Sequence, residues 1–138
     1  GYPLTDIKVS LIGGSYHEEE STDMAFGIAA AMAIRRATSE AQPKLLEPIM
    51  KLEVITPEEY IGDVIADLNS KRGKVVGVSA EDKLQILNAH VPLAEMFGYS
   101  TSLRSATQGR ANFTMQFLEY DVVPAQKAEI IIKKIRGI

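Results

Sequence analysis

The sequence of 138 residues contains no cysteine. A disulfide framework, a thiol nucleophile and a zinc site with thiolate ligands are therefore all excluded. A long apolar run is also missing, because the longest one, residues 24–34, is shorter than the roughly 18 residues that a membrane-spanning helix needs. We therefore expect no membrane span.

An excess of basic residues is missing as well. The sequence has 15 Lys and Arg against 18 Asp and Glu, so its formal net charge is -3 at pH 7. This argues against a protein that binds nucleic acid through its overall charge, although a local basic contact remains open. With 46% hydrophobic and 24% charged residues, the composition is that of an ordinary globular protein. The length suits one domain, or one small domain plus part of another.

The first forty residues predict an incomplete domain. Ile7, Val9 and Leu11 alternate with polar residues, which is typical of a half-buried strand. A polar loop with two glycines follows, and Ser21 or Thr22 can cap the helix expected after it.

That helix is expected over residues 22–40 and to be buried, since residues 24–34 are apolar on nearly every face. One strand and one helix cannot bury each other fully, and a stable sheet needs about three strands. The missing strands belong either to a partner chain or to another part of the same protein, and we favour a fragment of a larger protein.

The segment after Pro43 predicts a complete sheet. Thr56, Pro57 and Glu59 form a capping box that should begin the first helix, and Arg72-Gly73 should end it. Pro92 should open a turn, and the second helix should follow it and run to about Thr107, with a possible interruption at Gly98 and with Leu93, Met96, Phe97 and Leu103 as its apolar anchors. Period-two alternation predicts strands near residues 50–54, 75–78, 84–91 and 113–117, and a last helix is expected over residues 125–135.

The resulting order is β-α-β-β-α-β, which is typical of the α+β ferredoxin-like sandwich. In that fold a four-stranded antiparallel sheet carries two helices on one face. We therefore expect a ferredoxin-like domain preceded by a partial α+β domain and followed by a C-terminal helix.

Few residues suggest catalysis. His17 lies beside three glutamates, but consecutive loop residues point in different directions, whereas a metal needs about three or four converging ligands. A solvated polar loop is the favoured interpretation there, and a structural role is favoured for His90. Gly13-Gly14 is not followed by the lysine and hydroxyl residue of a phosphate-binding loop, so a nucleotide site is not indicated.

Residues 103–110 are more informative. They place Arg104, Ser105, Gln108 and Arg110 between the end of a helix and the start of a strand. Arginine can pair with phosphate or stack on a base, and serine and glutamine can bond to a nucleic-acid backbone. The alternative is a polar helix face that ends at a capping glycine, Gly109.

Several short strings together carry a family resemblance. In chain order they are Gly14-Ser15-Tyr16-His17, Met24-Ala25-Phe26, Leu45-Leu46-Glu47-Pro48-Ile49-Met50, Pro57-Glu58-Glu59-Tyr60, Gly62-Asp63-Val64, Asp67-Leu68-Asn69, Arg72-Gly73, Val91-Pro92-Leu93-Ala94-Glu95-Met96-Phe97-Gly98-Tyr99, Leu103-Arg104-Ser105 and Thr107-Gln108-Gly109-Arg110. In this order and spacing, the sequence resembles the C-terminal end of bacterial-type elongation factor G, a GTPase that drives ribosomal translocation.

The resemblance implies a domain layout. Residues 1–46 correspond to the C-terminal portion of domain IV, residues 47–121 to domain V, and residues 122–138 to a helix that packs back on the domain IV portion. It also implies a cytoplasmic protein. The chain itself would hold no cofactor and no catalytic residue, since GTP and Mg²⁺ would bind an N-terminal domain outside this sequence.

The resemblance also implies two RNA contacts. Gly14, Ser15, Tyr16 and His17 would form the tip loop of domain IV, which reaches the decoding centre near the mRNA–tRNA duplex. Arg104, Ser105 and Gln108 would contact the factor-binding region of the large subunit, including the sarcin–ricin loop. The three glutamates after His17 are more acidic than expected beside RNA.

Other functions stay open on the sequence alone. A recycling or ribosome-protection paralogue would share the same C-terminal layout. An acylphosphatase-like enzyme would need an arginine cradle and an asparagine, and Arg110 and Asn112 lie on a late strand, which is the wrong context. A stand-alone ferredoxin-like ligand-binding domain is the remaining alternative.

Overall fold

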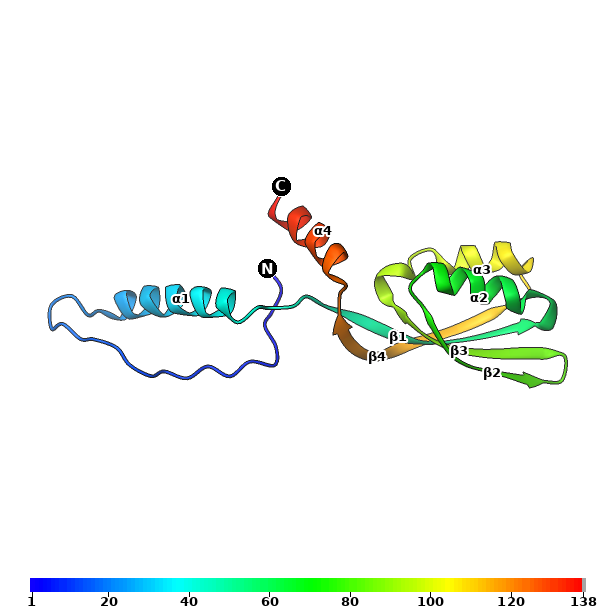
Figure 1. The fold of residues 1–138 in the computed structure, drawn as a ribbon, viewed down its shortest axis with the longest axis horizontal. Helices are drawn as coiled ribbons and strands as arrows, with labels where there is room; N and C mark the ends of the chain where they lie inside the picture. The colour runs from blue at the N-terminus through cyan, green and yellow to red at the C-terminus, as the bar shows by residue number, and fades with distance from the viewer. Residues whose placement is uncertain (138) are drawn as a thin grey trace. The chain divides into compact units, whose positions relative to one another are not determined.

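The computed structural model describes residues 1–137 and divides the chain into two compact units. One unit comprises residues 1–44 together with the chain from residue 126 onward, and the other comprises residues 45–125 (Figure 1). Each unit is described separately below.

Residues 45–125 form a four-stranded antiparallel sheet. Its strands are β1 (Leu46–Pro57), β2 (Lys74–Glu81), β3 (Leu84–Pro92) and β4 (Asn112–Val122), in the order β2-β3-β1-β4. Helices α2 (Ile61–Ser70) and α3 (Tyr99–Thr107) cover one face (Figure 1). The predicted α+β sandwich is confirmed.

The core lies between these helices and the covered face of the sheet. Alternation places Leu52 and Val54 of β1 on that face, where they are fully buried. Helical spacing brings Val64 and Leu68 of α2 down onto them. The remaining buried members of the core are Leu87, Ala89, Val91, Met96, Tyr99 and Leu103.

Strand β1 lies in the middle of the sheet and also pairs with β4 at its first residues. Leu46 is opposite Val122, and the Val123 N–H donates to the Leu45 carbonyl at 2.9 Å. The two ends of this unit are therefore hydrogen-bonded to each other.

The predicted capping box at Thr56 is wrong. Strand β1 extends through Pro57, so Thr56 is paired with Gln85 and fully buried. Its Oγ1 donates to the Pro57 carbonyl at 3.3 Å instead of accepting a helical N–H. A short 3-10 helix, η1 (Glu58–Tyr60), begins without a side-chain cap and leads into α2.

The predicted end of α2 at Arg72-Gly73 is confirmed. Arg72 takes a left-handed conformation with φ 59°, and the Gly73 N–H donates to the Leu68 carbonyl at 2.8 Å. A Cβ on Gly73 would lie 2.8 Å from the same carbonyl oxygen. The chain reverses here because residue 73 carries no side chain.

The helix expected after Pro92 is divided, as the possible interruption at Gly98 allowed. A 3-10 helix, η2 (Leu93–Glu95), is followed by a turn in which Gly98 has φ 77°, and α3 begins at Tyr99. Met96 and Leu103 are buried anchors as expected, but Phe97 is 82% exposed. The prediction for Phe97 is wrong because the turn breaks the helical phase and rotates this residue toward solvent.

The unit with residues 1–44 contains α1 (Asp23–Glu40) and α4 (Ala125–Arg136), both at the expected places. Thr22 caps α1, since its side chain accepts from the Ala25 N–H at 3.1 Å. The strand expected at residues 7–11 is absent, and Leu11 is 95% exposed. A strand needs a neighbour for its backbone groups, and none of residues 1–137 pairs with this segment.

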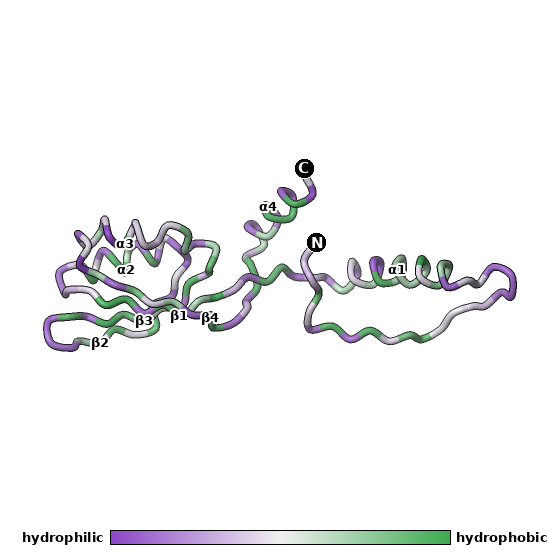
Figure 2. Tube along the Cα trace, turned by 180° about the vertical axis from the view of Figure 1, so that it is seen from behind, coloured by the Kyte–Doolittle hydropathy of each residue, from purple (hydrophilic) through white to green (hydrophobic). Residues whose placement is uncertain are grey.

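The expectation that α1 is buried is also wrong for this structure. None of its residues is buried, and Met24 is 76% exposed. Apolar residues line α1 and the segment before it (Figure 2). The composition of α1 is that of a helix which a complete domain would bury.

Candidate RNA interface

The first group of predicted contact residues lies at the C-terminal end of α3. This helix buries Tyr99, Leu103 and Thr107, which are spaced four residues apart on one face. Arg104 and Ser105 lie outside this buried face and are exposed. The Thr107 hydroxyl donates to the Leu103 carbonyl at 2.7 Å and accepts from the Ala111 N–H at 3.3 Å, which ties α3 to the start of β4.

Helix α3 ends abruptly beside these residues. Gln108 has φ 52° and Gly109 has φ 75°, so two successive residues are left-handed. The Gly109 N–H donates to the Arg104 carbonyl at 2.9 Å. Glycine adopts this conformation freely, but a glutamine in it is strained by about 1 kcal/mol or more. The strain fixes exposed Gln108 on the turn next to Arg104.

The three arginines of residues 45–125 differ in whether they form an ion pair with a carboxylate. Arg72 bonds to Glu47 and Glu95. The hydrogen bond with Glu47 is the largest of the effects on the pKa of the Arg72 guanidinium, and it raises that pKa. Arg110 bonds to Glu59 at 2.7 Å and lies 5.8 Å from the centre of the Tyr60 ring. Hydrogen bonding with Tyr60, and then the charge of Glu59, raise the pKa of the Arg110 guanidinium.

Arg104 differs from both. It is exposed and makes no ion pair within the part of the chain that the structure describes. A guanidinium with no carboxylate partner keeps its planar set of donors available for a phosphate. Sequence reasoning found this residue, but it could not show that Arg110 is engaged elsewhere.

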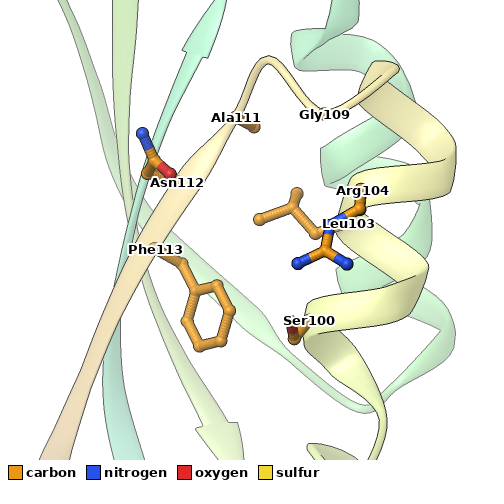
Figure 3. Close-up of a pocket in the computed structure, with 7 residues that line it drawn as sticks. All are labelled: Ser100, Leu103, Arg104, Gly109, Ala111, Asn112 and Phe113. Atoms are coloured by element: carbon orange, nitrogen blue, oxygen red, sulfur yellow. The ribbon is translucent and has the colours of Figure 1, made fainter.

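A pocket of about 240 Å³ lies between α3 and the start of β4. Its lining residues are Ser100, Leu103, Arg104, Gly109, Ala111, Asn112 and Phe113. In Figure 3 the Arg104 guanidinium projects from α3 toward β4, while the Asn112 side chain points to the other side of the strand. Arg104 is therefore the charged group of this pocket.

The second group, Gly14 to His17, lies in the other unit and is exposed throughout. The His17 N–H donates to Ser21 Oγ at 2.8 Å, and the His17 carbonyl accepts from the Ser21 N–H at 2.9 Å. The Tyr16 ring stacks on the Phe26 ring with a centroid distance of 6.4 Å. These contacts attach the loop to the first turns of α1.

Within residues 1–137 no three His, Asp or Glu side chains come close enough to share an ion. Arg110, the arginine considered for an acylphosphatase-like cradle, is engaged by Glu59. Across the same residues, no helix has the length and apolar character needed to cross a membrane.

Comparison with known proteins decides the family. Residues 44–131 match the family described as "Elongation factor G C-terminus", and residues 1–42 match "Elongation factor G, domain IV". The chain belongs to the elongation factor G family. The resemblance inferred from the short sequence strings is confirmed.

Individual relatives agree. Elongation factor G 2 of Desulfotalea psychrophila (strain LSv54 / DSM 12343) is 75% identical over 138 residues, which is 100% of this chain and 20% of that protein. A crystal structure of a Thermus thermophilus protein is 41% identical, covers 91% of this chain and 19% of its own, and superposes with a TM-score of 0.76. The chain thus spans about a fifth of the length of these relatives.

Proposed function

We propose that this chain is the ribosome-contacting C-terminal part of an elongation factor G that promotes GTP-dependent translocation of tRNA and mRNA. Residues 1–46 would be the end of domain IV, residues 47–121 domain V, and residues 122–138 a helix that packs on the domain IV portion. GTP and Mg²⁺ would bind another domain of the full-length protein, which is proposed to be cytoplasmic.

The single observation that supports this proposal best is the state of Arg104. It is an exposed guanidinium without an ion pair within residues 1–137, next to exposed Ser105 and strained Gln108. The left-handed Gln108 is the cap that ends α3, so the free cation, which the fold does not use in an ion pair, is the feature that suggests a binding surface. The proposed ligand is the sarcin–ricin loop region of large-subunit RNA.

The loop from Gly14 to His17 is the second proposed contact. Its side chains are exposed, and its backbone is anchored through His17 and Ser21. An anchored loop with an aromatic and an imidazole ring can enter an RNA groove with little loss of entropy. We propose that it reaches the decoding centre.

The test is Arg104→Ala in the full-length factor. We expect weaker binding to the large subunit and slower translocation, whereas Arg36→Ala, which removes an exposed arginine paired with Glu40 on α1, should leave large-subunit binding unchanged. Unchanged ribosome binding and translocation in the Arg104 variant would contradict the proposal.

A second test concerns GTP. Because the sequence contains no phosphate-binding loop, the 138-residue chain should not bind GTP. Calorimetric titration with GTP·Mg²⁺ checks this, and saturable micromolar binding would be the contrary result.

A further inference from the structure

Phe97 is the most exposed of the large apolar residues in residues 45–125. Its exposed fraction is 82%, whereas the residues around it, Met96 and Tyr99, are 6% and 2% exposed. A phenyl ring left in water forgoes the stabilisation that burial would give. The folding of residues 45–125 therefore does not account for the position of this ring.

A backbone hydrogen bond closes the turn that carries Phe97. The Tyr99 N–H donates to the Met96 carbonyl at 3.1 Å, and Gly98, with φ 77° and ψ 7°, has the angles of the third residue of a type II turn. Phe97 thus occupies the corner of a closed turn between two buried anchors. Because the backbone of the turn is already ordered, only the side-chain torsions of Phe97 remain to be fixed when it binds.

An ion-pair cluster holds the same turn from the other side. Glu95, two residues before Phe97, accepts from Arg72 Nε at 3.0 Å. Arg72 in turn bonds to Glu47 of β1 at 2.7 Å. The position of the turn is therefore fixed relative to the central strand of the sheet.

The surface that runs from Phe97 along α3 to Arg104 is suited to binding a polyanion. Residues 96–118 contain no aspartate or glutamate, although the whole chain has a net charge of -3. Helix α3 is nine residues, about 13 Å, long and has Arg104 toward its far end. Three carboxylates of the flanking elements are paired with cations, Glu95 with Arg72, Glu59 with Arg110, and Asp67 with Lys71. Glu58 and Asp63 are exposed and make no ion pair within residues 1–137, so the acid-free stretch is confined to residues 96–118.

We propose that Phe97 stacks on an unpaired nucleobase of the same ribosomal RNA that Arg104 contacts. This inference rests on the proposed function and adds a base-stacking residue to it. Every nucleobase has a face that an exposed aromatic ring can cover, and the lack of acidic residues removes the repulsion that phosphates would meet. The unpaired Arg104 on the same helix favours a ligand that carries phosphates over an apolar pocket on a protein.

Three variants of the 138-residue chain test the proposal in binding titrations with large ribosomal subunits. Phe97→Leu keeps much of the apolar volume but removes the aromatic face, and should weaken affinity about tenfold, within the range for base–aromatic stacking. Phe97→Tyr should bind like the wild type. The matched control is Tyr120→Leu, which removes another exposed ring (63%) flanked by Glu119 and Asp121, and should also bind like the wild type.

A spectroscopic readout follows from Phe97→Trp, because the sequence contains no tryptophan. The indole at position 97 would be the sole tryptophan, and stacking on a base should quench its emission when large subunits are added. Adding Arg104→Ala to this variant should reduce the quenching at a given subunit concentration.

The outcomes separate the two proposals. Wild-type affinity of Phe97→Leu, or an indole that is not quenched, overturns the stacking proposal, while a loss with Arg104→Ala still supports the proposed function. Tight binding by Phe97→Leu together with weak binding by Phe97→Tyr would identify an apolar protein pocket and overturn it as well. If Arg104→Ala binds like the wild type, the proposed function itself fails.

Discussion

Arg72 bonds to Glu47 with both of its terminal nitrogens, at 2.7 Å from Nη1 to Oε1 and 3.1 Å from Nη2 to Oε2. The two residues come from the α2–β2 turn and the start of β1, and Glu47 is 7% exposed. The hydrogen bond with Glu47 raises the pKa of the Arg72 guanidinium, against the opposing effect of burial. This bidentate pair joins the beginning of the central strand to the end of a helix.

Arg72→Met is expected to lower the free energy of unfolding by about 3 kcal/mol, because it leaves the Glu47 carboxylate buried without its partner. Urea denaturation followed by circular dichroism measures this change. Arg104→Met is the matched control and should change stability by no more than about 0.5 kcal/mol, since Arg104 is exposed. Equal losses in the two variants would contradict this role of the pair.

Substitution by alanine should change the stability of the protein in opposite directions at Gly73 and Gly62. A Cβ at Gly73 would lie 2.8 Å from the Leu68 carbonyl oxygen and 3.2 Å from Val91 Cγ2, so Gly73→Ala should cost about 2 kcal/mol. Gly62 lies in α2 with no atom within 4 Å of such a Cβ, so Gly62→Ala should add about 0.5 kcal/mol. Thermal melts of both variants check this, and a loss with Gly62→Ala would count against the structure around α2.

Removal of the Tyr99 hydroxyl should stabilise the protein at neutral pH. The ring packs edge-on against Phe113 at a centroid distance of 5.0 Å, but the buried hydroxyl has no hydrogen-bond partner within residues 1–137. Tyr99→Phe keeps the packing and removes the unsatisfied group, so we expect a gain of about 1 kcal/mol in chemical denaturation. A loss of similar size would reveal a partner for the hydroxyl.

The same residue predicts a pH dependence. Burial, and then the charge of Asp67, raise the pKa of Tyr99 above its ordinary value of 10.0. Above pH 10 the unfolded chain therefore releases this proton while the folded chain keeps it, so stability falls as pH rises, by at most about 1.4 kcal/mol per pH unit. The stability difference between Tyr99→Phe and the wild type should widen between pH 10 and pH 12, and a constant difference would contradict it.

Gln108 predicts a conflict between stability and binding. Its φ of 52° is strained for glutamine but not for glycine, so Gln108→Gly should raise the free energy of unfolding by about 0.5 to 1 kcal/mol. The same change should weaken binding of the full-length factor to the large subunit, because it removes a proposed contact. Denaturation and ribosome titration measure the two effects, and unchanged ribosome affinity would remove Gln108 from the interface.

The order of the strands could be predicted because the alternation of Met50, Leu52 and Val54 and the hairpin spacing before Leu84 are local signals. The end of β1 could not be predicted from the sequence. Thr56 is a residue type that commonly caps a helix, and only the pairing of strands in the sheet makes it a buried strand residue. Local pattern also could not tell that the strand expected at residues 7–11 would lack a neighbour.

The candidate site was predicted in part. The short strings of the sequence indicated Arg104, Ser105 and Gln108, and the structure gathers all three at one helix end. The sequence predicts Phe97 as an apolar anchor of a helix that begins after Pro92, together with Leu93, Met96 and Leu103. The left-handed Gly98 reverses that assignment, and the hydrogen bonds that close the turn join groups that the sequence pattern does not show together.

The pairing of Leu46 with Val122, and the bond from Val123 to Leu45, have a practical consequence for engineering. The polypeptide enters residues 45–125 through β1 and leaves them through β4, and these two strand ends lie next to each other. The segment could therefore be excised as a cassette and its flanks rejoined by a short turn. Force applied at those two junctions would open the β1–β4 ladder one hydrogen bond at a time, starting with the bond from Val123 to Leu45.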